Sequence, residues 1–211
     1  MKKFILALII FFVTGAANFA DAAEIDRAFY NGNPDLSYPL IFTKNEDAAA
    51  QINKAIRAEI QRFLDATNKQ LVEGDFKSVT VGVDYQIPCN HENGILSIIL
   101  TEYVNFEGSA HPSTYQRGLN FNSDSGARLT ADTLSEIARH GNDYTPLELT
   151  KKLRAYSEKN KLPLFQDFQQ LNQTPEDFYF DDNLHVHFLF QQYEVAPYAA
   201  GIIDLDADAK Y

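Results

Sequence analysis

The spacing of two histidines is the best candidate for a pair of metal ligands in this sequence. His185 and His187 are two residues apart in an alternating segment, so their side chains leave the same face of a predicted strand. Two imidazoles on one face can begin a zinc site, with His111 as the candidate third ligand. A closed site needs more ligands than this spacing supplies, so two histidines on a solvated strand face are the favoured interpretation. We therefore predict no cofactor, and zinc bound by His111, His185 and His187 is the less favoured alternative.

His111 stands among small residues in Gly108-Ser109-Ala110-His111-Pro112, directly after an apolar strand. Small residues let the backbone approach closely, and a histidine there can hold two loops by bonding through both ring nitrogens. A general base is the functional alternative, but a base needs a nucleophile. The sequence has no nucleophile elbow, phosphate loop, dinucleotide fingerprint or zinc-protease motif. These absences favour a binding protein over an enzyme.

The most distinctive segment spans residues 192–201 and is neither periodic nor polar. Its two tyrosines, Tyr193 and Tyr198, and its Pro197 predict a rigid and well-packed loop between two strands. Aromatic residues in loops are also frequent binding anchors. Packing is the simpler interpretation. If the chain binds a ligand, we predict contacts with Tyr193, Pro197, Tyr198 and His111.

A long helix is the clearest element that must position these residues. Residues 24–35 are polar and loop-like, and residues 36–42 form a predicted first strand. Thr43 and Glu46 then provide a capping box, and Gly74 stands where the helix should end. Between them, one helical stripe is formed by Ile52, Ile56, Ile60, Phe63, Thr67 and Leu71.

Alternating segments predict the strands. Residues 79–87, 95–106 and 115–121 follow one another through short turns, which favours an antiparallel meander with the second strand in the centre. A short helix capped by Thr133 and Glu136 is predicted to end near Gly141, and a further helix begins at Thr145 and Pro146. Strands follow at 184–190 and 202–205. We therefore expect an α+β fold: an antiparallel sheet meander with one long N-terminal helix and further helices packed on one side.

The N-terminal segment predicts export. Lys2 and Lys3 precede an apolar stretch, and Ala20-Asp21-Ala22 fits a cleavage site, so residues 1–22 are interpreted as a signal peptide. The apolar stretch is shorter than an ordinary spanning helix, so we expect no stable membrane insertion after cleavage. The predicted location is extracytoplasmic, in the periplasm or secreted.

The charge of the mature chain indicates the class of macromolecule it can bind, and its cysteine content excludes an internal disulfide. Removing Lys2, Lys3 and Asp21 leaves 16 basic and 28 acidic residues, a net charge of −12. Such a surface repels nucleic acid and attracts a basic protein. Cys89 is the only cysteine, so no intramolecular disulfide can form, and we expect this thiol to be buried.

Four motifs in the second half of the chain occur in the order that characterises one protein family. They are the His111 motif, Leu119-Asn120-Phe121-Asn122 with Gly126, Asp177-Phe178-Tyr179-Phe180, and Tyr193 to Gly201. This pattern resembles an extracytoplasmic domain-of-unknown-function family found, with its usual N-terminal companion domain, in the lysozyme sensor region of the anti-sigma-V factor and in a peptidoglycan deacetylase. The resemblance covers about residues 36–206.

The resemblance implies a recognition domain and carries no catalytic residues. It divides the chain into the signal peptide, a companion half at 23–105 and a sensor-like domain at 106–211, packed as one unit with the first half. We expect a non-enzymatic, exported binding domain of the cell envelope, with a basic protein such as lysozyme or cell-wall glycan as its partner. A small envelope hydrolase, zinc-assisted or not, and a structural envelope protein are the alternatives.

Overall fold

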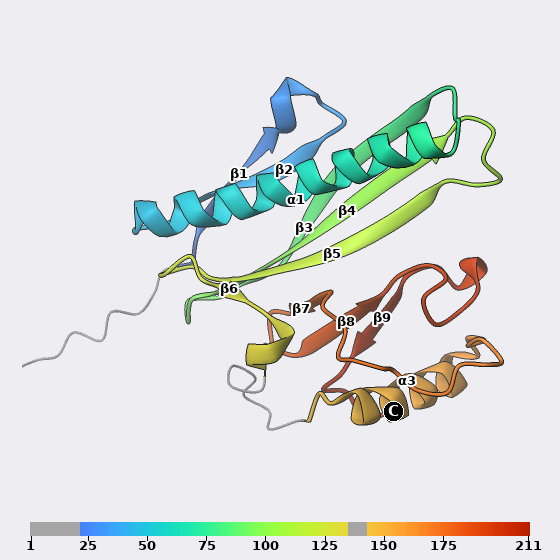
Figure 1. The fold of residues 1–211 in the computed structure, drawn as a ribbon. Helices are drawn as coiled ribbons and strands as arrows, with labels where there is room; N and C mark the ends of the chain where they lie inside the picture. The colour runs from blue at the N-terminus through green and yellow to red at the C-terminus, as the bar shows by residue number, and fades with distance from the viewer. Residues whose placement is uncertain (1–21, 135–142) are drawn as a thin grey trace, which may run out of the picture.

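The computed structural model describes residues 22–134 and 143–211, and its elements stack in four layers (Figure 1). The long helix α1 covers one face of the large sheet, the small sheet packs beneath the large one, and α3 closes the other side. The elements are β1 (Glu24–Phe29), η1 (Tyr30–Gly32), β2 (Ser37–Phe42), α1 (Glu46–Glu73), β3 (Val79–Asn90), β4 (Ile95–Phe106), β5 (Ser113–Asn122), β6 (Arg128–Leu129), η2 (Ala131–Thr133), α3 (Pro146–Asn160), β7 (Phe178–Phe180), β8 (Val186–Phe190), η3 (Tyr198–Ala200) and β9 (Ile203–Asp206).

The predicted signal peptide lies outside the described residues, apart from Ala22. Within the two described ranges, none of the helices has the length and apolar character needed to cross a membrane.

The start of the chain differs from the prediction. Residues expected as a polar loop form β1, which pairs antiparallel with β2 from Glu24 opposite Phe42 to Phe29 opposite Ser37. Only Ile25 and Ala28 of β1 are partly buried, so the strand lacks a strong apolar alternation and is held by pairing with β2. The long helix is therefore not an N-terminal element: α1 begins at residue 46, after this hairpin, within the range 43–74 that the sequence predicts for it.

The long helix itself has the predicted apolar face but a different cap. The side chain of Asn45 accepts hydrogen bonds from the backbone N–H groups of Asp47 and Ala48, at 3.1 and 3.3 Å. Thr43, the predicted cap, donates to the carbonyl of Asn45 instead. The stripe is buried from Ile52 to Thr67, and Gly74 is the C-cap.

The strands form three sheets, so the prediction of a single meander was wrong. The large sheet has the antiparallel order β3-β4-β5-β6, with β4 central as predicted. However, β7, β8 and β9 form their own antiparallel sheet, and β1 pairs with β2. The helices α1 and α3 lie on opposite outer faces rather than on one side (Figure 1). Most of the short helix predicted to end near Gly141 lies outside the described residues.

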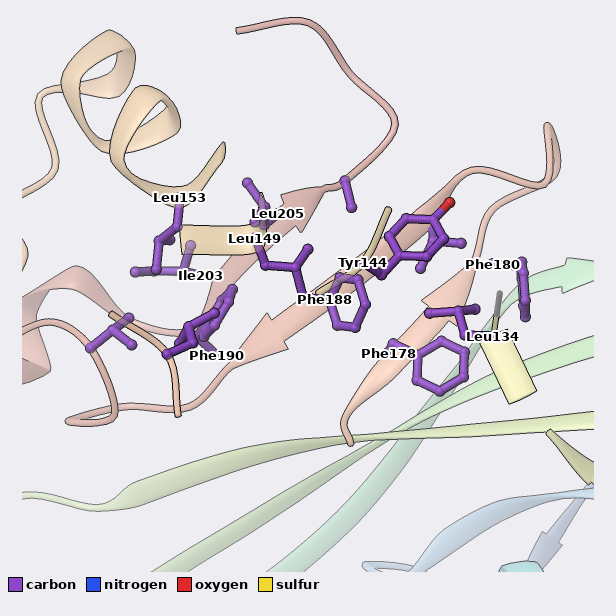
Figure 2. Close-up of a cluster of buried hydrophobic side chains, with 14 of the residues drawn as sticks. Leu134, Tyr144, Leu149, Leu153, Phe178, Phe180, Phe188, Phe190, Ile203 and Leu205 are labelled. Carbon is purple, nitrogen blue, oxygen red and sulfur yellow. The ribbon is translucent and has the colours of Figure 1, made fainter. Parts of the chain in front are cut away.

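A second core explains why the last strands separate from the large sheet. Four phenylalanines of β7 and β8 are almost completely buried, and they pack with leucines of α3 and with β9 (Figure 2). These residues include Phe178, Phe180, Phe188, Phe190, Leu149, Leu153 and Leu205. Because α3 supplies the cover, the small sheet buries its apolar face without pairing edge to edge with the large sheet.

The large and small sheets approach each other closely at Gly118 of β5. A Cβ atom built on Gly118 would lie 1.9 Å from the carbonyl oxygen of Phe178. Only glycine leaves room for the backbone of β7 at this point.

Candidate functional site

Three of the predicted site residues meet where the β4–β5 turn contacts the β8–β9 loop. His111 lies in the turn between β4 and β5, and its ring stacks on Tyr198 with the ring centres 3.9 Å apart. The Nε2 atom of His111 lies 3.1 Å from the hydroxyl of Tyr193. The tyrosines come from the loop between β8 and β9, so residues about eighty positions apart converge. We call His111, Tyr193, Pro197 and Tyr198 the aromatic corner.

Hydrogen bonds fix the orientation of the histidine ring. The Nδ1 atom of His111 lies 2.9 Å from the carbonyl of Pro112, which only accepts hydrogen bonds, so Nδ1 carries a proton. In a neutral ring Nε2 then accepts from the Tyr193 hydroxyl, while Tyr198 also donates to the Pro112 carbonyl, at 3.1 Å. The Nδ1 contact stays within the turn of His111, whereas the Nε2 contact reaches the loop of Tyr193, so the ring links the two loops through Nε2.

Tyr193 is both exposed and held in an unusual backbone conformation. It is 56% exposed, and its φ of 65° lies in the left-handed region that is costly for a residue with a side chain. Val195 and Ala196 anchor the loop in the core, and the half-buried Pro197 directly precedes η3. The corner therefore presents a rigid aromatic side chain to solvent.

His185 and His187, the other two members of the predicted zinc set, are not in the aromatic corner. His187 contacts Asp204, at 2.8 Å from Nδ1, and stacks on Tyr179, whereas His185 lies 3.4 Å from Asp206. Burial lowers the pKa of His187, but hydrogen bonding and the charge of Asp204 outweigh it, so the pKa is raised overall. Among the described residues, no group of three histidine, cysteine or acidic side chains has an arrangement that could hold a metal ion.

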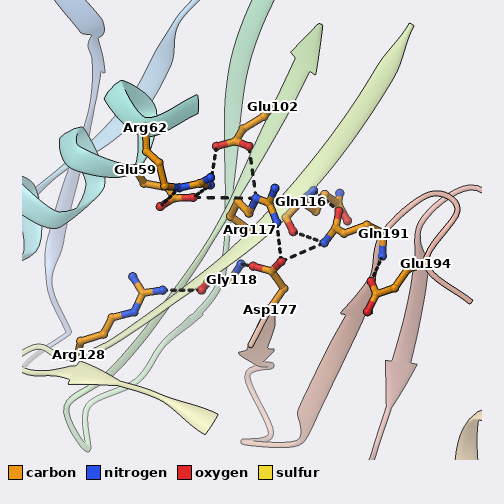
Figure 3. A network of polar contacts seen from close by, with 10 residues as sticks. All are labelled: Glu59, Arg62, Glu102, Gln116, Arg117, Gly118, Arg128, Asp177, Gln191 and Glu194. Atoms are coloured by element: carbon orange, nitrogen blue, oxygen red, sulfur yellow. Dashed lines mark hydrogen bonds and ion pairs between the residues drawn. The ribbon is translucent and has the colours of Figure 1, made fainter. Parts of the chain in front are cut away.

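A polar network that the sequence reasoning missed lies where β5 faces the small sheet (Figure 3). The edge of β5 that faces away from β4 pairs with β6 only at Asn120 and Phe121, and before these residues side chains take the place of a strand. Gln191 both accepts from the N–H of Gln116 and donates to its carbonyl, at 2.9 and 2.7 Å. Asp177 accepts from the N–H of Gly118, and Arg128 donates to the carbonyl of the same residue. These contacts protect the sheet edge and join it to the loops around the small sheet.

Glu102 is the least expected member of this network. It is 1% exposed, and its Oε2 atom lies 3.4 Å from Arg117, which also contacts Asp177 at 2.9 Å. The Oε1 atom has no hydrogen-bond partner among the described residues, and Arg62 is 3.9 Å away. Burial raises the pKa of Glu102 to about 7 against the attraction of Arg117. The signal in the sequence was one carboxylate within the apolar alternation of 96–106.

The chain is an α+β protein with two hydrophobic cores. The large sheet and the small sheet are joined by side-chain contacts along β5 and at the aromatic corner. Residues 31–114 match the family model described as Deacetylase PdaC, and residues 127–206 match the model described as Protein of unknown function (DUF3298). The chain thus carries a DUF3298 domain preceded by a PdaC domain, which confirms the resemblance to this family and its companion. The matches indicate a bacterial envelope-associated domain of unknown function.

Solved structures agree with this assignment at the level of the fold. A DUF3298 family member from Bacteroides fragilis has 14% sequence identity and a TM-score of 0.52, and each chain covers 88% of the other. A family protein from Pseudomonas aeruginosa has 16% identity and a TM-score of 0.53, with the same 88% coverage of both chains. No match was found among curated proteins. The division predicted between residues 105 and 106 stays a prediction.

Proposed function

We propose that this chain is a non-enzymatic binding domain of the bacterial cell envelope that acts outside the cytoplasm and recognises a basic protein such as lysozyme. The observation that carries the proposal is the aromatic corner, where His111 and Tyr198 hold Tyr193 exposed in a fixed position. A rigid tyrosine contributes contact area with little loss of conformational entropy on binding, which is typical of binding hot spots.

The charge of the chain supports a basic partner. The net charge is −11, so the electrostatic field of the protein would speed its encounter with a cationic protein. Catalysis is not part of the proposal, because the sequence has no nucleophile motif. The export signal predicted at residues 1–22 would deliver the domain to the envelope.

Calorimetric titration with lysozyme at low ionic strength tests the proposal. We expect saturable binding that weakens as salt is added, and at least a tenfold loss of affinity in Tyr193→Gly. The matched control is Phe29→Ala, which removes another exposed aromatic side chain, in β1. Absence of heat with the unmodified protein would refute lysozyme as the partner, and equal loss in both variants would refute the role of the corner.

Cell-wall glycan is the second candidate ligand. The observation that favours it is a groove lined by amide side chains, which begins at Tyr193. Soluble peptidoglycan fragments, titrated in the absence of lysozyme, test this ligand separately.

A further inference from the structure

A groove of about 1000 Å³ runs beside the aromatic corner. One wall is the irregular segment 165–175 between α3 and β7, and the other is the loop at 193–195. Its volume lies at the upper end of the range of about 300–1000 Å³ for ligand pockets. The groove therefore has room for more than one sugar ring, and Tyr193 belongs both to it and to the corner.

The irregular wall is held in place by the body of the protein. Arg154 of α3 donates to the carbonyls of Phe168 and Gln169, at 2.9 and 2.7 Å, and Thr150 accepts from the N–H of Leu171 at 3.0 Å. The N–H of Phe165 donates to the carbonyl of Val195, which ties one wall to the other. A groove formed in advance loses little entropy when it takes a ligand.

The side chains in the groove are suited to a neutral and polar ligand. Four exposed amide side chains line it, and their amide groups make no hydrogen bond within the described part of the chain: Gln169, Gln170, Asn172 and Gln173. An amide both donates and accepts, which matches the hydroxyl and acetamido groups of an amino sugar.

Aromatic and acidic residues complete the groove. Phe165, Phe168 and Tyr193 offer apolar ring surface, on which the C–H face of a pyranose can pack. The charged lining residues are Asp167 and Glu194, with no lysine or arginine in the lining that the structure describes. This charge disfavours phosphate, nucleic acid and anionic sugars.

We propose that this groove binds an uncharged chain of N-acetylated amino sugars. This inference deepens the second candidate function above, because it names the site and the chemical class of the glycan. It does not depend on lysozyme binding, so the two proposals can fail separately.

The test is a titration of the full chain with tetra-N-acetylchitotetraose, followed by calorimetry and by amide NMR shifts. The groove variant is Asn172→Ala with Gln173→Ala, and the matched control is Asn68→Ala with Gln70→Ala, which removes the same two side-chain types from the exposed surface of α1. We expect equal affinity for the unmodified protein and the control, and at least a tenfold loss in the groove variant.

Several results would overturn the inference. They are absence of binding at millimolar ligand, equal affinity in the groove and control variants, and NMR shifts that avoid residues 165–175. Cellotetraose, which lacks the acetamido groups, should bind at least tenfold more weakly, and equal binding would refute the assignment to amino sugars. Equal affinity for an uncharged Gly-Asn repeat peptide would refute a glycan site in favour of a peptide site.

Discussion

The buried carboxyl of Glu102 should make the protein less stable as the pH rises. Burial in the network raises its pKa from 4.5 to about 7, and Arg117 offsets only part of this effect. The folded state therefore binds the proton more tightly than the unfolded state does. The resulting stabilisation is fully present below pH 4.5 and is lost as the pH rises through 7.

The two pKa values set the size of the effect. Proton linkage between 4.5 and about 7 corresponds to a loss of roughly 2–3 kcal/mol in the free energy of unfolding between pH 5 and pH 8. Glu102 is 1% exposed, so screening by solvent does not reduce this figure substantially. A loss of this size is a large fraction of the stability of a typical domain.

Glu102→Gln isolates the effect, because glutamine keeps the shape and does not titrate. Urea unfolding of both proteins from pH 5 to pH 8 should show the stability of the variant, relative to the unmodified protein, rising by roughly 2–3 kcal/mol. Other titrating groups, such as Asp177 and His187, are present in both proteins and cancel.

The control is a core change without a titratable group. Ile98→Val on β4 should cost about 1 kcal/mol at every pH. If the difference between Glu102→Gln and the unmodified protein is also constant with pH, the assignment of a raised pKa to Glu102 is wrong.

Three further predictions follow from close contacts and burial. Gly118→Ala should lower stability by more than about 2 kcal/mol in thermal unfolding, because the new Cβ would meet the carbonyl of Phe178. Gly82→Ala, whose nearest neighbour would be 3.7 Å away, is the control, and equal effects would refute the steric argument. Tyr193→Gly should change stability by less than about 1 kcal/mol, since relief of the left-handed backbone offsets the lost hydrogen bond, so a larger loss would contradict a purely binding role. Cys89 is fully buried and its pKa is raised to about 12, so Ellman's reagent should label it at pH 8 only as the protein unfolds, and rapid labelling of the native protein would contradict this.

Periodicity and capping motifs in the sequence correctly predicted the helices α1 and α3, because short-range interactions define where a helix begins and which face it buries. The stripe from Ile52 to Thr67 and the Thr145–Pro146 start of α3 are where periodicity and capping placed them. The strand β1 was missed because pairing with β2, rather than its own alternation, holds it in place. The third sheet was missed because the cover that α3 gives to Phe188 is a tertiary contact without a sequence signature.

In the candidate site, too, local sequence predicted some features, while others depend on tertiary contacts. The Tyr193–Tyr198 loop stood out by composition, and the double bonding of His111 was predicted from its ring chemistry. The pairing of the β5 edge by Gln191 could not be predicted, because it joins residues 75 positions apart through side chains that are ordinary surface types.

Amide NMR mapping of the surface that contacts lysozyme tests the central claim most directly. The account predicts that lysozyme, added at low ionic strength, shifts the signals of residues 109–112 and 191–199 and leaves those of α1 unchanged. Shifts centred on α1, or a spectrum that does not respond to lysozyme, would contradict the proposal that the aromatic corner binds a basic protein.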